Sequence, residues 1–176
     1  MQLTYRIALT AVGAGFSGGL AAPATAQTMD VTVTILRMSV AEYHKPYVAI
    51  WLEPAAGGAR TLAVWYDFDM KNNEGTKWLR DVRQWWRVSG RSMRFPADGV
   101  TGATRAPGPQ RISFTAGRGA LGAMAPGQYT LVVEAAREVG GRELVRVPFA
   151  WPPRPGQAAR ASGSAELGAI SIAFRR

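Results

Sequence analysis

The sequence predicts an all-β protein: a single immunoglobulin-like antiparallel β-sandwich with one short helix. About seven short segments alternate apolar and polar residues, as strands with one buried face do. Clusters of Gly, Pro, Asn and Asp separate these segments at the short spacing that is typical of sandwiches. Only one stretch has a helical period, and no internal repeat or change of composition divides the chain, so residues 27–176 are predicted to form one domain.

The first three strands are predicted between residues 31 and 66. The apolar residues of 31–35 alternate with threonines, which indicates a strand. Segments 47–52 and 61–66 are rich in β-branched and aromatic residues, and the Pro- and Gly-containing stretch 54–58 between them predicts a hairpin.

The helix is predicted over residues 77–87, after a polar turn at 71–75 and a capping hydroxyl at Thr76. Its apolar residues recur at i, i+1, i+4, i+7 and i+8, which places them on one helical face. They are Trp78, Leu79, Val82, Trp85 and Trp86.

The second half of the chain reads as a long loop followed by four more strands. Residues 94–110 contain several Pro and Gly and are predicted to be a loop, and 117–127 and 152–162 are predicted to be irregular for the same reason. The predicted strands are 112–114, 128–134, 144–151 and 167–174, with a hairpin turn at 138–142.

The first 26 residues are typical of a secretory signal peptide. Arg6 precedes a mostly apolar stretch over 7–20, and Ala24-Thr25-Ala26 supplies a cleavage site of the A-x-A kind. We therefore predict removal of residues 1–26 and a periplasmic protein. The chain has no Cys, which excludes disulfides and thiolate metal sites.

The charge balance favours acidic partners. The formal net charge is +9, and about +8 remains once Arg6 is removed. Lys and Arg are scattered rather than interleaved with stacking aromatic residues, so nucleic acid is not predicted as a partner. A solvated basic surface and peripheral contact with a membrane surface both remain open.

Familiar catalytic and metal-binding patterns are missing from the sequence. The G-x-G-x-x-G string at 117–122 has no βαβ unit around it, so a dinucleotide site is not predicted. His44 is the only His, which argues against a His-rich metal site and against a hydrolase with a Ser-His-Asp triad. Asp67 and Asp69 alone do not form a calcium loop, so no metal ligand and no catalytic residue is predicted.

One heptapeptide carries the strongest functional signal. Residues 98–104 read D-G-V-T-G-A-T, and the pattern D-x-x-[S/T]-G-A-T that they contain should by composition occur with a probability of about 0.1% in a chain of this size. The simplest alternative is an ordinary turn, because Gly and Asp are common where a chain bends. In either case Asp98 and Thr101 are expected to hydrogen-bond nearby backbone and to hold the segment in a turn.

The heptapeptide resembles the acceptor sequence D-x-x-[S/T]-G-A-[S/T] that flavin transferases of the ApbE type modify in exported redox proteins. The resemblance implies that FMN is joined to Thr104 by a phosphoester bond. Gly102 and Ala103 then let the backbone approach the transferase closely. Arg105 follows the motif at once and is placed to pair with the phosphate.

Three further segments resemble the predicted periplasmic family called domain of unknown function 2271. They are residues 44–51, residues 77–81 with Trp85-Trp86, and residues 127–138 with Gly140-Gly141. The resemblance runs from about Val31 to Trp151. Proteins of that family are found with PepSY-type membrane proteins and flavin transferases, which implies electron transfer outside the cytosol, sometimes linked to iron acquisition.

The tryptophans of the predicted helix have two possible roles. Aromatic residues dominate core packing, and the simplest expectation is that Trp78, Trp85 and Trp86 are buried. The alternative is that one or two of them stack on the flavin ring or shield it from water.

Two functional hypotheses follow. The first is a periplasmic electron carrier with covalent FMN on Thr104, which exchanges electrons with a PepSY-type membrane protein and is more a redox carrier than an enzyme with its own substrate. The second is a cofactor-free β-sandwich adaptor, which docks through its basic face onto a membrane redox or iron-uptake system.

Overall fold

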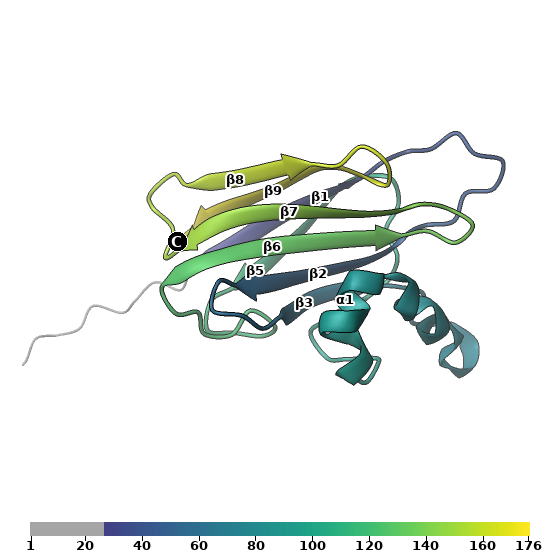
Figure 1. Ribbon diagram of the computed structural model, residues 1–176, viewed down its shortest axis with the longest axis horizontal. Coiled ribbons are helices and arrows are strands. Elements are labelled where there is room, and N and C mark those ends of the chain that lie inside the picture. Colours follow the sequence, from purple (N-terminus) through teal and green to yellow (C-terminus); the bar gives the residue numbers. More distant parts are fainter. Residues whose placement is uncertain (1–26) are drawn as a thin grey trace, which may run out of the picture.

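The computed structural model describes residues 27–176, and the predicted signal peptide lies outside the described residues. In this part of the chain nine strands form two sheets, of order β5-β1-β9-β8 and β4-β3-β2-β6-β7 (Figure 1). The predicted all-β sandwich is therefore confirmed. The strands are β1 (Thr28–Ile35), β2 (Tyr47–Pro54), β3 (Arg60–Trp65), β4 (Thr101–Gly102), β5 (Gly108–Thr115), β6 (Gly127–Ala136), β7 (Arg142–Trp151), β8 (Ala158–Ser162) and β9 (Leu167–Arg175).

The main core lies between the two sheets. β1 alternates half-buried polar residues with buried Met29, Val31 and Val33, which is the pattern of a strand with one face on a core. Neighbouring strands are paired antiparallel, except that β4 runs parallel to β3 at the edge of the five-stranded sheet.

The central strands of the five-stranded sheet are buried on both faces. In β2, residues 48, 50 and 52 point into the main core, whereas Tyr47, Ala49 and Trp51 belong to a second apolar cluster on the outer face. A strand without polar alternation is typical of a sheet that is covered on both sides. The five-stranded sheet is thus the middle layer of three.

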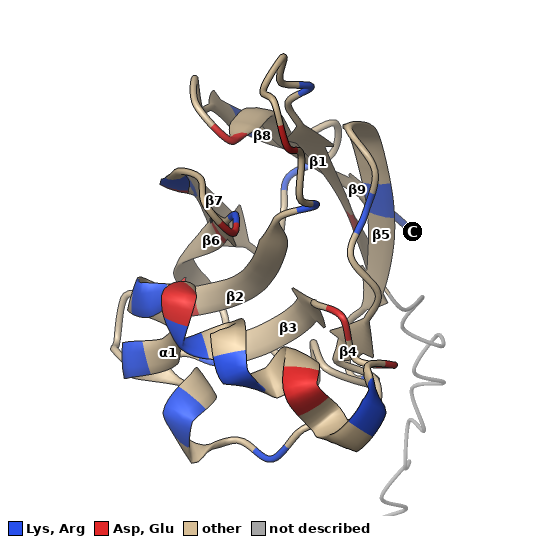
Figure 2. Cartoon of the chain, turned by 90° about the vertical axis from the view of Figure 1, so that its right-hand side faces the viewer, with Lys and Arg blue, Asp and Glu red and all other residues tan. Residues whose placement is uncertain are grey.

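The third layer consists of short helices, and Figure 2 shows it beside β2 and β3. It contains the 3₁₀ segment η1 (Lys71–Asp81), the α-helix α1 (Arg83–Val88) and the 3₁₀ turn η2 (Gly90–Ser92). The prediction of one continuous helix over 77–87 is wrong, because the chain leaves helical geometry at Val82. Thr76 is not an N-cap either, since its hydroxyl donates backwards to the carbonyl oxygen of Asn73.

A buried carboxylate explains the break at Val82. Glu134 on β6 is 0% exposed and accepts hydrogen bonds from the backbone N–H groups of Gln84 and Trp85, at 3.1 and 2.8 Å. Its charged partner is the Arg142 guanidinium at 2.7 Å. Starting a new helix after Val82 points free N–H groups at this carboxylate, and the helix dipole favours the negative charge there.

Two segments that were predicted to be irregular contain strands. β8 lies within 152–162 and pairs with β9, although its Ala-rich sequence has little intrinsic strand preference. The predicted loop 94–110 contains β4 and the start of β5. In both cases the hydrogen bonds of a neighbouring strand supply the order that local sequence does not.

A second carboxylate organises the turn before β9. Glu143 accepts hydrogen bonds from the backbone N–H groups of residues 164, 165, 166 and 167, at 2.7 to 3.0 Å. Burial raises the pKa of the Glu143 carboxyl, but the four hydrogen bonds together lower it by more than burial raises it. The pKa of Glu143 therefore lies below its ordinary value.

Candidate functional site

The first half of the heptapeptide forms a closed turn. The carbonyl oxygen of Ala97 accepts hydrogen bonds from the N–H groups of Val100 and Thr101, at 3.2 and 2.9 Å. Thr101 Oγ1 accepts from the N–H of Ala97 at 2.8 Å, which is the local bond that the sequence predicted for this residue. Gly99 has a φ of 68°, a conformation that favours glycine.

Asp98 behaves differently from Thr101. Its side chain is exposed, and within residues 27–176 we find no hydrogen bond to it. The predicted role of Asp98 in closing the turn is therefore wrong: the Thr101 hydroxyl takes that place, and Asp98 faces solvent.

The second half of the motif adds a short strand to the sheet edge. The N–H groups of Val64 and Tyr66 donate to the carbonyl oxygens of Val100 and Gly102, both at 2.9 Å. A Cβ on Gly102 would lie 3.1 Å from Cδ1 of Trp65, which is tighter than ordinary packing. Glycine at this position therefore lets β4 approach the tryptophan.

Thr104 emerges from this edge and contacts Asp67. Its Oγ1 donates a hydrogen bond to Oδ1 of Asp67 at 2.9 Å, from a residue 37 positions later in the chain. Thr104 and Asp67 are half-buried, whereas the flanking Ala103 and Arg105 are exposed. The sequence placed Asp67 near the aromatic residues but gave no indication of its contact with Thr104.

Arg105 lies over the buried Trp65. Its guanidinium carbon is 5.2 Å from the centre of the ring, which is within the range of a cation–π interaction. Because the Arg105 side chain is also exposed, its N–H groups remain available to an anion at the surface.

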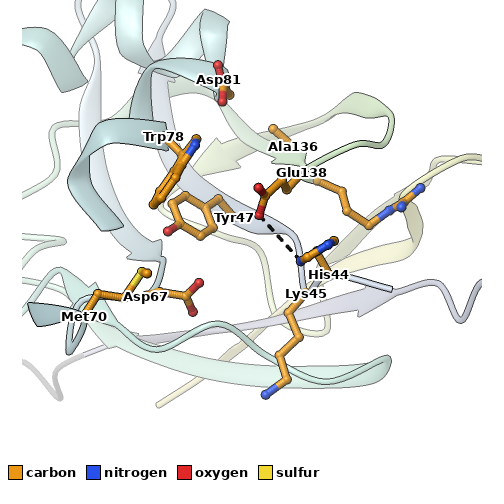
Figure 3. Close-up of a pocket in the computed structure, with 10 residues that line it drawn as sticks. His44, Lys45, Tyr47, Asp67, Met70, Trp78, Asp81, Ala136 and Glu138 are labelled. Atoms are coloured by element: carbon orange, nitrogen blue, oxygen red, sulfur yellow. Dashed lines mark ion pairs between the residues drawn. The ribbon is translucent and has the colours of Figure 1, made fainter. Parts of the chain in front are cut away.

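A hollow of about 120 Å³ opens next to Asp67 (Figure 3). The rings of Tyr47 and Trp78 form one part of its wall, and the ion pair of His44 with Glu138 forms another. The lining residues are His44, Lys45, Tyr47, Asp67, Met70, Trp78, Asp81, Ala136, Arg137 and Glu138. Since Asp67 both lines the hollow and holds Thr104, the hollow and the acceptor motif are neighbours.

Two polar groups of the hollow, Tyr47 and His44, lie close to carboxylates. Burial, and next to it the negative charge of Asp67, raises the pKa of Tyr47 far above its ordinary value, so the phenol keeps its proton at neutral pH. The His44 imidazole lies between two carboxylates, with Nε2 3.1 Å from Glu42 and Nδ1 3.5 Å from Glu138. These partners favour the structural interpretation of His44 over a role as base or ligand.

The three tryptophans of the helical layer separate into different environments. Trp78 lines the hollow, and Trp86 is half-buried with its ring centre 6.1 Å from that of Trp85. Trp85 is 0% exposed, and its Nε1 donates to Thr61 Oγ1 at 3.0 Å. Such burial agrees with the simplest expectation for Trp85, that it packs in the core, and argues against the alternative that it is a flavin neighbour.

The outer side of the helical layer is basic (Figure 2). Residues 71–94 contain seven Lys or Arg against two acidic residues, and all seven are exposed. We call them the basic surface: Lys71, Lys77, Arg80, Arg83, Arg87, Arg91 and Arg94. Among the ion pairs of residues 27–176, only Lys77 of this set has a partner, Glu74 at 3.1 Å.

Between residues 27 and 176, no three His, Asp or Glu side chains are grouped as a metal site would require. None of the helices in this part reaches the length and apolar character of a membrane span.

Comparison with known proteins gives one match. The family model described as "Predicted periplasmic protein (DUF2271)" matches residues 28–169, from the start of β1 into β9. Neither the curated proteins nor the solved structures gave a match. Because the family model covers strands of both sheets, the helical layer and the heptapeptide 98–104, the chain belongs to the DUF2271 family of predicted periplasmic proteins.

Proposed function

We propose that this protein is a periplasmic electron carrier with FMN attached to Thr104 by a flavin transferase of the ApbE type. The observation that carries the proposal is the position of Thr104. Thr104 is the last residue of an acceptor-like motif and lies just beyond the edge strand β4, between the exposed Ala103 and Arg105. Its hydroxyl contacts Asp67, which lines a hollow with aromatic walls.

The hollow is suited to part of a flavin ring system. A cavity of about 150 Å³ holds one benzene ring. The hollow of about 120 Å³ is open to the surface, so it has room for one edge of the tricyclic ring while the rest stays outside. Tyr47 and Trp78 are the side chains placed to stack on that edge, because both present rings to the hollow.

The residues around Thr104 are suited to the other half of the cofactor. Arg105 can donate charge-assisted hydrogen bonds to a phosphate on Thr104 from its place above Trp65. The phenol of Tyr47 keeps its proton and can donate a hydrogen bond to a ring oxygen or nitrogen. FMN, when bound, supplies the reversible electron transfer that these side chains cannot perform.

The basic surface supports a membrane-bound redox partner of the PepSY type. Seven exposed cations with one partnered member give a strong local field, which steers association with acidic proteins or anionic lipid headgroups. Electron exchange through this surface should therefore slow steeply as ionic strength rises, since exposed charges are screened over about 8 to 10 Å at physiological salt.

The direct test is the mass of the protein after co-expression with an ApbE-type transferase. We expect a gain of FMN minus water, flavin absorbance, and a modified peptide that maps to Thr104. The variant Thr104→Ala should lose all three, whereas Thr104→Ser should keep them because it retains the hydroxyl. Unchanged mass in the wild type, or persistent modification in Thr104→Ala, would disprove the attachment.

One observation favours the cofactor-free adaptor as the second candidate. The exposed apolar residues Phe68, Met70 and Val88 lie within or next to the helical layer that carries the basic surface. Mixed basic and apolar surface is typical of docking sites on other proteins or membranes. Protein isolated from its native host with no colour and unmodified mass would select this candidate.

A further inference from the structure

We propose that Asp67 is the base for flavin attachment, so that this chain itself activates the hydroxyl that the transferase modifies. The inference rests on the proposed function and names a residue outside the acceptor motif. Asp67 lies two residues beyond the end of β3, the strand with which β4 pairs.

The contact is formed between the two groups that such a step requires. Thr104 Oγ1 is the donor and Asp67 Oδ1 the acceptor, 2.9 Å apart, which is within reach of a general base. A hydroxyl is a weak nucleophile at neutral pH, and an adjacent base that takes its proton is the common means of activation. The pairing of β3 with β4 fixes this geometry before the transferase arrives, because residues 64 and 65 are in register with 101 and 102.

The surroundings of Asp67 differ from those of a structural carboxylate. Glu134 is fully buried and accepts three hydrogen bonds from N–H donors, so its charge is committed to holding α1 and Arg142. Asp67 is half-buried and lines a hollow that opens to solvent, so a proton that it accepts can leave. The Asp67 carboxylate accepts a hydrogen bond from the Thr104 hydroxyl and lies against the phenol of Tyr47, which belongs to the wall of the same hollow.

The step balances with FAD as the flavin donor. Thr104 Oγ attacks the phosphorus of the FMN half of FAD and forms the Oγ–P bond. The P–O bond of the pyrophosphate breaks, and AMP leaves with the bridging oxygen. The hydroxyl proton passes to Asp67 and then to water or to the departing AMP, and no electron is transferred.

The test compares two neighbouring carboxylates in full-length protein purified without transferase. Asp67→Asn removes the base but keeps the size of the side chain, and Asp69→Asn is the matched control because Asp69 is exposed two residues away. With FAD and transferase in single-turnover reactions, we expect Asp67→Asn to lower the rate of FMN mass gain at least about 100-fold. Asp69→Asn should keep the wild-type rate.

A pH profile separates a base from a positioning residue. The wild-type rate should stay level from neutral to mildly alkaline pH, whereas the residual rate of Asp67→Asn should rise with hydroxide across the same range. Asp67→Glu should restore the level profile, and it also keeps the test available if Asp67→Asn does not fold by circular dichroism. Equal rates for Asp67→Asn and Asp69→Asn, or a hydroxide-dependent rate for Asp67→Glu, would overturn the assignment.

The outcomes distinguish this inference from the proposed function. If the wild type gains no FMN mass, both fail together. If the wild type and Asp67→Asn are modified at the same rate, attachment at Thr104 stands and only the role of Asp67 is disproved.

Discussion

The helical layer packs against the five-stranded sheet, whereas residues 97–104, which we call the β4 edge, form a border of that sheet, and the two regions are held in different ways. The helical layer is anchored by a fully buried carboxylate with three donors and by the buried ring of Trp85. The β4 edge contains a strand of two residues, and the hydroxyl of Thr104, two residues beyond that strand, donates one hydrogen bond to the half-buried Asp67. Saturated, buried contacts fix structure, whereas a single accessible contact leaves a group free to react.

Trp85→Ala should have the largest effect on stability, because it removes a fully buried ring from the helical layer. We expect a loss of about 3–5 kcal/mol in the free energy of unfolding, measured by urea titration. Trp78→Ala is the matched control, since Trp78 is only half-buried and should cost clearly less. A smaller loss for Trp85 than for Trp78 would contradict the division between core and hollow.

Glu134→Gln should follow, because it leaves the Arg142 charge without its partner and weakens the start of α1. The expected loss is about 2–3 kcal/mol, again from urea titration. Asp67→Asn is the variant to compare with it, because we expect its loss in the free energy of unfolding to be less than about 1 kcal/mol. Equal losses for the two variants would show that both carboxylates are structural.

Glu143 is a second carboxylate that accepts several hydrogen bonds, and its contribution to the free energy of unfolding depends on pH. Its pKa is lowered in the folded protein, so its contribution is present above the ordinary value of 4.5 and is lost as pH falls through the folded value. Glu143→Gln should therefore cost about 1–2 kcal/mol at neutral pH, and the difference from wild type should vanish under acid. Melting temperatures of both proteins between about pH 3 and pH 7 provide the measurement, and a difference that does not change with pH would disprove it.

Gly102→Ala should have the smallest effect on the free energy of unfolding, but it should displace the β4 edge and so change the rate of FMN attachment. The added Cβ meets Trp65 at 3.1 Å, so β4 has to shift by a few tenths of an ångström at a cost of about 1 kcal/mol or less. We expect slower FMN attachment at nearly unchanged melting temperature. Gly99→Ala tests the turn instead, because nothing lies near its Cβ but its φ is 68°.

The fold could largely be predicted because its strands satisfy local rules. Alternation in β1 and continuous apolar runs in β2 and β3 are visible in the sequence, and both are consequences of which faces are buried. The break at Val82 could not be predicted, because its cause is Glu134, some 50 residues away along the chain. β8 was missed for a similar reason, since its order comes from β9.

The candidate site was predicted in part. The motif identified Thr104, and the turn bond of Thr101 followed from local hydrogen-bonding rules. Asp67 was missed as the partner of Thr104 because the contact depends on a parallel pairing of β3 with β4. A strand of two residues is too short to show a recognisable pattern in the sequence. The burial expected for Trp85 is confirmed, but the sequence did not separate it from the half-buried Trp78 and Trp86, because helical period alone does not tell which apolar residue faces the sheet.

The sequence by itself determined the sandwich class, the family and the acceptor-like motif, because periodicity and short motifs are properties of neighbouring residues. The tertiary structure decided which carboxylate is saturated, which tryptophan is accessible and which residue holds the Thr104 hydroxyl. These depend on contacts between segments tens of residues apart, and burial and hydrogen bonding are set only when the sheet brings such segments together.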